Sequence, residues 1–125
     1  MIRTILAIDD SATMRALLQA ALAQAGYDVT VAADGEIGLD IAASTDFDLV
    51  LTDHHMPVKS GLDVIAALRA RPAYESTPIL VLTTERSDAF KAAAREVGAT
   101  GWIEKPLDPE VLIDLVATLS APAAS

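Results

Sequence analysis

Residues 48–57 read DLVLTDHHMP, a short apolar run that ends on a carboxylate and is soon followed by a turn-forming proline. The run is too short for a typical helix and is rich in strand formers, so we expect residues 49–52 to form a buried strand. Asp53 then stands where this strand leaves its sheet. A carboxylate there is either a loop residue that caps a turn, which is common, or a reactive group at the mouth of a sheet. The other strands have to decide between these interpretations.

Composition limits the class of protein. The 125 residues are enough for one domain with its own core. The chain has no cysteine, which fits a reducing compartment, and its net charge of -9 argues against binding to a nucleic-acid backbone. No apolar run reaches the roughly 18 residues of a membrane span, and the first residues enter a strand instead of a signal peptide. We therefore expect a monomeric, cytoplasmic protein without membrane or nucleic-acid partners.

Strand and helix patterns alternate five times along the chain. The expected strands are residues 4–8, 27–31, 47–52, 79–82 and 100–104. The helices between them are expected to start at Ser11, Asp34, Gly61, Ser87 and Asp108. This alternation demands a parallel sheet covered on both faces by right-handed crossovers, which is a doubly wound α/β sandwich of the (βα)5 type. We expect one domain over residues 1–120 and a frayed Ala/Pro/Ser tail at residues 121–125.

Residue spacing also predicts details of the packing. Ile37 and Ile41 lie one turn apart and are expected on the inner face of the second helix, where Gly38 would allow close packing on the sheet. The third helix is expected to turn Ala66 inward together with its larger apolar residues. Residues 72–78 are interpreted as a polar connector.

Polar residues follow four of the five expected strands. The first strand leads to Asp9 and Asp10, the third to Asp53, the fourth to Thr83 and the fifth to Lys105. Ligands of open α/β sheets bind beyond the carboxyl ends of the strands, so these side chains should converge in one shallow cleft. Each has an ordinary explanation alone, such as an acid favoured at a helix start by the dipole. Their convergence at one edge favours a functional site.

The charges of this group suggest its chemistry. Clustered carboxylates repel one another unless a cation lies among them, and ligation by oxygen alone favours Mg²⁺ over zinc. Asp53 could attack phosphorus as a carboxylate nucleophile. Mg²⁺, Lys105 and the Thr83 hydroxyl would then share the charge of the phosphoryl oxygens.

Ordered motifs connect these residues: Asp9-Asp10; Asp53 followed by Met56-Pro57 and Gly61; Thr83; and Lys105-Pro106. Through them the chain, from residue 2 to about residue 120, resembles the receiver domain of two-component response regulators, and most of all the stand-alone chemotaxis-type members. The resemblance implies a flavodoxin-like sheet with the strand order 2-1-3-4-5. It also implies a cis bond between Lys105 and Pro106, which an X-Pro bond permits.

The resemblance implies a role for each acid. Asp53 matches the phosphoacceptor, which receives its phosphoryl group from the phosphohistidine of a sensor histidine kinase or phosphotransfer protein. Asp10 matches the direct Mg²⁺ ligand, and Asp9 the acid that reaches the metal through water. The backbone carbonyl of His55 matches the third protein ligand, beside Asp53 itself.

The resemblance implies an output as well. Thr83 and Lys105 match the hydroxyl and ammonium that bind the phosphoryl group, and Trp102 stands where many members carry an aromatic switch residue. Phosphorylation should then reshape the face made by the fourth helix, the fifth strand and the last helix, where members commonly bind a downstream protein target. Such a protein catalyses only its own phosphorylation and dephosphorylation and is not otherwise an enzyme.

Four residues depart from the family pattern: His54, His55, Thr84 and Trp102. We expect them to tune rates and partners, with His55 and Thr84 bordering the path of the hydrolytic water. The two histidines also permit a zinc site. That alternative is less favoured, because adjacent residues of an extended segment point to opposite sides.

Other functions have to be weighed against this one. A receiver can serve as a phosphate sink. A small aspartate-nucleophile phosphohydrolase of the haloacid-dehalogenase type would carry its nucleophile on the first strand with a second Asp two residues later, whereas here the third strand carries it and His55 occupies that later position. A degenerate receiver used only for binding would lack part of the site, yet all five residues are present. Nucleotide binding is not supported, because the sequence has no glycine-rich phosphate loop.

Overall fold

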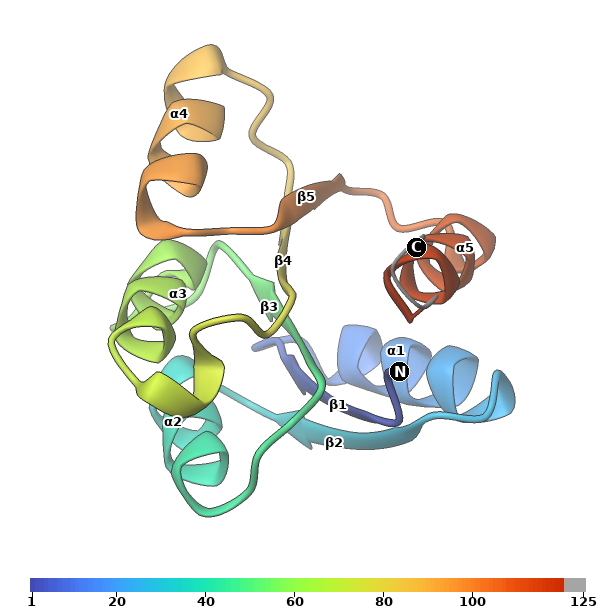
Figure 1. Ribbon diagram of the computed structural model, residues 1–125. Helices are drawn as coiled ribbons and strands as arrows, with labels where there is room; N and C mark the ends of the chain where they lie inside the picture. The colour runs from blue at the N-terminus through green and yellow to red at the C-terminus, as the bar shows by residue number, and fades with distance from the viewer. Residues whose placement is uncertain (121–125) are drawn as a thin grey trace, which may run out of the picture.

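The computed structural model describes residues 1–120, which form five strands and five α-helices around one sheet (Figure 1). The strands are β1 (Thr4–Ile8), β2 (Asp28–Ala32), β3 (Leu49–Asp53), β4 (Ile79–Thr83) and β5 (Gly101–Glu104). The helices are α1 (Ala12–Gln24), α2 (Gly35–Ser44), α3 (Gly61–Arg69), α4 (Asp88–Val97) and α5 (Pro109–Ser120), with a 3-10 helix η1 (Pro72–Tyr74) before β4. The boundaries of β1 match the expected ones, and those of the other strands differ by at most two residues. The tail that was expected to fray lies outside the described residues.

The sheet has the predicted topology. Its strands are all parallel and lie in the order β2-β1-β3-β4-β5, so the doubly wound α/β class is confirmed. Helices α1 and α5 cover one face, and α2, α3 and α4 cover the other (Figure 1). Successive residues of β1 alternate between the two resulting cores: Leu6 and Ile8 pack on the α2 side, Ile5 and Ala7 on the α1 side. Both faces are therefore buried, which explains the continuous apolar runs.

Helix α2 follows the expectation for its isoleucines only in part, since Ile41 packs against the core but Ile37 does not. Ile37 is 44% exposed, and the buried residues of the helix are Gly35, Gly38, Leu39 and Ala42. Gly38 faces the sheet so closely that a Cβ atom there would lie 2.7 Å from Cγ1 of Ile8. The smallest residues thus set the rotation of α2, and the close packing predicted for Gly38 is confirmed. In α3 the inward prediction for Ala66 was also wrong, since it is exposed.

The connector over residues 72–78 is not purely polar surface as predicted. It contains η1, whose Tyr74 is 1% exposed. The Tyr74 hydroxyl lies 2.7 Å from the carbonyl oxygen of Thr45 and accepts a hydrogen bond from the backbone N–H of Phe47. An aromatic body with a polar tip suits such a position, because its ring fills the core while its hydroxyl satisfies loop backbone groups.

Arg69, the last residue of α3, ties three segments together. Its Nη1 donates to the carbonyl oxygens of Tyr74 at 2.6 Å and Thr77 at 2.7 Å, and its Nε donates to that of Gly98 at 2.9 Å. Gly98 ends α4 in the left-handed conformation with φ 97°. Partial burial lowers the pKa of Arg69 from its normally very high value. This side chain therefore fixes the ends of α3 and α4 relative to the segment before β4.

The two ends of the described chain meet at the edge of the sheet opposite the carboxyl ends of the strands. The backbone N–H of Ile2 donates to Oγ of Ser120 at 3.0 Å. Nearby, the Asp48 carboxylate accepts hydrogen bonds from the N–H groups of Arg3 and Thr4, which lower the pKa of Asp48. Over residues 1–120, the structure contains no helix that is both long and apolar enough to cross a membrane.

Candidate functional site

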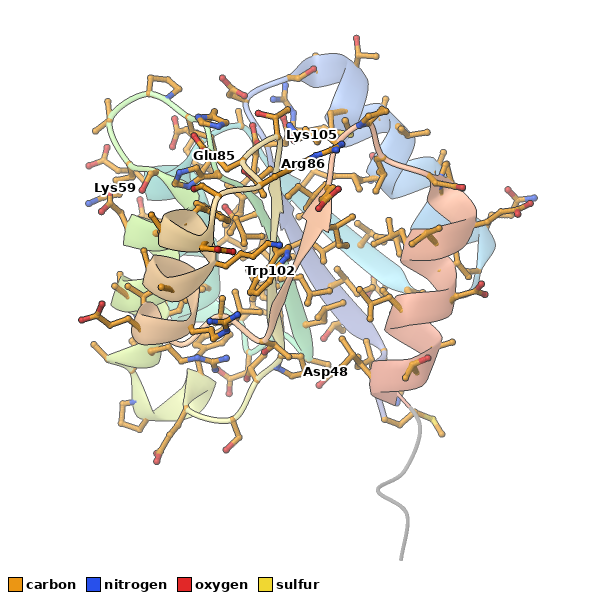
Figure 2. The ribbon with its side chains drawn as sticks, turned by 90° about the horizontal axis from the view of Figure 1, so that it is seen from above. Asp48, Lys59, Glu85, Arg86, Trp102 and Lys105 are labelled. Atoms are coloured by element: carbon orange, nitrogen blue, oxygen red, sulfur yellow. The ribbon has the colours of Figure 1, made fainter. Side chains whose placement is uncertain are left out.

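The parallel sheet delivers the predicted site residues to one edge. Asp9 and Asp10 directly follow β1, Asp53 and Thr83 are the last residues of β3 and β4, and Lys105 directly follows β5. The register pairs Ile8 with Thr52, Asp53 with Leu82, and Thr83 with Glu104, so the strand ends are level with one another. In Figure 2, Lys105 lies at this edge and Asp48 at the opposite one.

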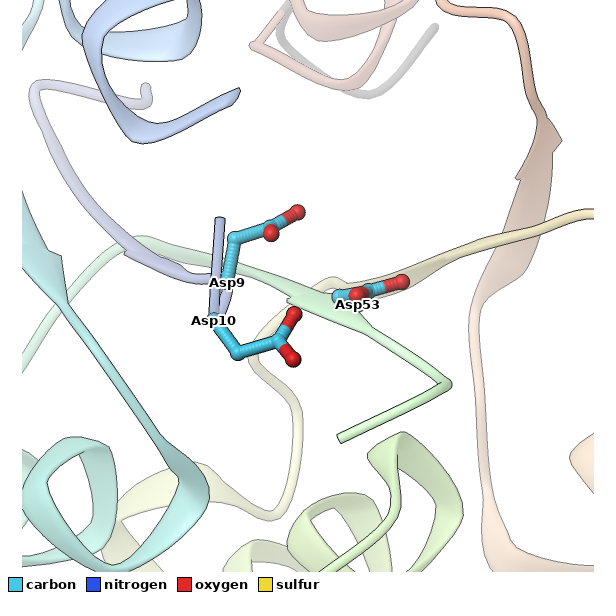
Figure 3. A group of neighbouring side chains, drawn as sticks. All are labelled: Asp9, Asp10 and Asp53. Carbon is cyan, nitrogen blue, oxygen red and sulfur yellow. The ribbon is translucent and has the colours of Figure 1, made fainter. Parts of the chain in front are cut away.

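The three acids form a compact cluster. Carboxylate oxygens of Asp9, Asp10 and Asp53 all lie within 4.8 Å of one another (Figure 3). Asp9 and Asp53 are buried, whereas Asp10 is exposed. Within residues 1–120 this is the only group of three or more His, Cys, Asp or Glu side chains placed to hold a metal ion. Its donors are all oxygens, which suits a hard cation and not zinc.

Asp9 is the acid whose surroundings most clearly favour a nearby cation. Its Oδ1 accepts a hydrogen bond from the N–H of Ser11 at 2.9 Å, but its buried Oδ2 has no hydrogen-bond partner. Burial raises the pKa of Asp9, and the neighbouring Asp53 carboxylate raises it further, against the lowering effects of the Ser11 N–H and Lys105. A buried, unpartnered carboxylate oxygen is costly in a protein interior. The cluster therefore fits a bound cation.

Lys105 is the cation that the chain itself supplies. Its Nζ lies 2.8 Å from Oδ1 of Asp53 and 3.8 Å from Oδ2 of Asp9, and its side chain is only 22% exposed. The bond between Lys105 and Pro106 is cis, as the resemblance implied. The ammonium is therefore close enough to Asp53 to contact a group attached to that carboxylate as well.

Thr83 is buried and joins the site to the loop that leads into α4. Its Oγ1 accepts a hydrogen bond from the N–H of Glu85 at 2.8 Å. The hydroxyl proton remains available to a further acceptor, because a hydroxyl both donates and accepts. A movement of this hydroxyl would therefore also act on the loop.

The two histidines after Asp53 do not diverge as an extended segment would require. Their ring centroids are 4.8 Å apart, because the chain already bends at His54. The His54 ring packs edge-on against Phe90 of α4, and burial lowers the pKa of His54. His55 is exposed, with Nε2 3.9 Å from Oε1 of Glu85. No third ligand joins the two rings among the described residues, so nothing in the geometry favours zinc.

Sequence reasoning missed two features that shape the site. Nη1 of Arg15, near the start of α1, donates to the carbonyl oxygen of Asp9 at 2.8 Å; the only hint in the sequence was a cation one turn after Ser11. Gly61 fits where no other residue would, since a Cβ there would lie 2.6 Å from the carbonyl oxygen of Asp53. The glycine of the motif is therefore needed for close approach to the acidic cluster.

Strand β5 and helix α4, two of the elements expected to form the output face, lie next to each other. Trp102 of β5 lies between that strand and α4 (Figure 2). It is partly buried against the core that contains Phe90 and Ala94 of α4. Arg86, in the loop before α4, pairs with Glu104 of β5 at 3.3 Å.

Residues 5–117 match the response regulator receiver domain family. The chain belongs to that family. This receiver is 36% identical over 110 residues to the chemotaxis protein CheY1 of Helicobacter pylori, with 86% of this chain and 89% of the relative covered. Its function is therefore that of a receiver in two-component signalling.

Solved structures agree with this assignment. The receiver matches chemotaxis protein CheY4 of Vibrio cholerae with a TM-score of 0.90 at 41% identity, over 94% of this chain and 98% of that one. A response regulator protein from Burkholderia multivorans matches with a TM-score of 0.85 at 78% identity, over 100% of both chains. The receiver is thus similar to chemotaxis response regulators in both sequence and fold.

Proposed function

We propose that Asp53 accepts a phosphoryl group from the phosphohistidine of a sensor histidine kinase or phosphotransfer protein. The observation that carries this proposal is the position of Asp53, whose Oδ1 lies 2.8 Å from the Lys105 ammonium and whose carboxylate clusters with those of Asp9 and Asp10. The attack of a carboxylate on a phosphate brings two anions together. Positive charge close to both groups offsets their repulsion. The site offers one fixed cation and a cluster of acids suited to a second.

Each residue of the site has its own role in the transfer. One oxygen of Asp53 forms the new bond to phosphorus while the bond from phosphorus to the donor nitrogen breaks and its electron pair stays on that nitrogen. Lys105 and the Thr83 hydroxyl bind phosphoryl oxygens as charge moves onto them. Asp9, Asp10, Asp53 and the His55 carbonyl would hold Mg²⁺, which would supply positive charge to offset the repulsion between carboxylate and phosphate.

The phosphoryl group then acts as a signal. Its oxygens draw the Thr83 hydroxyl inward, and Trp102 turns toward the space left behind. This reshapes the face of α4, β5 and α5 for a downstream protein partner. We place the exchange in the cytoplasm, in keeping with the absence of cysteine, and the chain catalyses only its own phosphorylation and dephosphorylation.

Acetyl phosphate tests the acceptor. With Mg²⁺, intact-protein mass spectrometry should show one added phosphate on the parent protein and none on Asp53→Asn. Asp28→Asn is the matched control, because Asp28 is an exposed acid at the opposite edge of the sheet, and it should label like the parent. Full labelling of Asp53→Asn would exclude this acceptor. Undiminished labelling in EDTA would exclude the metal.

A further inference from the structure

Helix α4 is held on the sheet by few apolar contacts of its own. Only Phe90 and Ala94 of its ten residues are buried. Beside it runs the edge strand β5, in which Trp102 faces the core under α4 and the next residue, Ile103, faces the opposite core. The Trp102 side chain therefore fills the space between the edge strand and α4.

Two cations of α4 lie over the Trp102 ring. Nζ of Lys91 is 5.7 Å from the ring centroid, and Cζ of Arg95, one turn later, is 5.4 Å away. Across residues 1–120, neither side chain forms an ion pair or donates a hydrogen bond. Arg86, by contrast, is paired with Glu104. The indole is thus the group that the charges of Lys91 and Arg95 contact.

A cation over an aromatic face is attracted by the ring quadrupole only while the ring stays in place. Turning Trp102 toward Thr83 would take the ring out of the position in which both cations contact it. The two contacts consequently favour the resting position over the turned one. They also fasten α4 to β5, so that a turned ring would leave the helix less tightly held.

We propose that Lys91 and Arg95 are positioning residues for Trp102, which hold its indole in the resting place and thereby set how readily phosphorylation switches this receiver. The proposal rests on the proposed function, since it assumes that Trp102 turns when Asp53 is modified. It adds that phosphorylation has to overcome the two cation–π contacts before Trp102 can turn.

The expected size follows from typical cation–π contacts. Losing one such contact at a partly exposed site shifts an equilibrium roughly two- to fivefold, and losing both shifts it roughly four- to twenty-fivefold if they act independently. A ligand that binds the turned state gains apparent affinity by up to the same factor, because more of the free protein is already competent.

Beryllofluoride with Mg²⁺, a stable mimic of the acyl phosphate, is the probe. Trp102 is the only tryptophan of the chain, so its emission reports the titration. Lys91→Gln and Arg95→Gln should each tighten apparent beryllofluoride binding roughly two- to fivefold, and the double variant more. Lys91→Arg keeps a cation at this position and should bind beryllofluoride with the affinity of the parent. Arg3→Gln is the charge-loss control, because Arg3 is exposed at the distant edge, and it should bind like the parent.

Acrylamide quenching of the resting proteins gives a second readout. The double variant should be quenched more than the parent and the Arg3→Gln control. Equal beryllofluoride affinities of the double variant and the parent would overturn the proposal. If the parent itself binds no beryllofluoride, the proposed function fails instead. The quenching comparison then still decides whether the two cations hold the ring.

Discussion

Replacing Arg69 by methionine should destabilise the receiver far more than a partly exposed side chain suggests. Arg69→Met keeps much of the apolar stem and removes the guanidinium, which donates at 2.6, 2.7 and 2.9 Å to three carbonyl oxygens. Hydrogen bonds from charged groups contribute about 1.5–3 kcal/mol each. Water can reach this site and satisfy part of what is lost, so we expect the free energy of unfolding to fall by about 2–4 kcal/mol.

Urea denaturation followed by far-UV circular dichroism measures this loss, and a thermal scan should show a Tm lower by roughly 8–20 °C. Arg71→Met is the matched control: Nη1 of Arg71 donates one bond, to the carbonyl oxygen of Leu39 at 3.0 Å, so about 1–2 kcal/mol is expected. Equal losses in the two variants would refute the reasoning. A loss below about 1 kcal/mol for Arg69→Met would show that the three bonds are exchanged for water without penalty.

Four further outcomes are expected. Asp48→Asn should destabilise the protein most above about pH 4 and hardly at all in strong acid, because the lowered pKa of Asp48 makes its contribution vanish as pH falls; a pH-independent difference in urea midpoints would contradict this. Gly38→Ala should destabilise by about 1–2 kcal/mol despite its better helix propensity, since overpacking against Ile8 outweighs that gain; a raised Tm would show that the close approach is absent. Asp10→Ala should abolish Mg²⁺-dependent labelling by acetyl phosphate, and labelling at the parent rate would remove Asp10 from the site. Thr84→Ala should dephosphorylate faster by opening the path of the hydrolytic water, whereas a rate equal to that of the parent would make Thr84 a bystander.

The residues of the site could be predicted because a parallel sheet brings the carboxyl ends of all its strands to one edge. Once residues 49–52 were interpreted as a strand, Asp53 was expected at the same edge of the sheet as Asp9 and Lys105 without any knowledge of loop conformation. The order of the strands could not be obtained from local patterns. It came from resemblance, since alternation alone permits several orders.

Packing that depends on the rotation of a helix could not be predicted from the sequence. Ile37 matched the expected stripe of α2, but it lies outward because Gly38 faces Ile8 of the sheet. Tyr74 looked like part of a polar connector because its partners are backbone groups of a distant segment. The contacts of Lys91 and Arg95 with the indole likewise depend on the distance between α4 and β5, which no linear pattern encodes.

Because Ile2 is hydrogen-bonded to Ser120, the two ends of the described backbone lie next to each other. A short linker between these ends would allow circular permutation, with new termini opened in an exposed connection far from the acids. The register of the strands would then survive a changed chain order. Such a permuted receiver could carry a fluorescent reporter at its new ends, so that the phosphorylation state would be read out in a cell without a downstream partner.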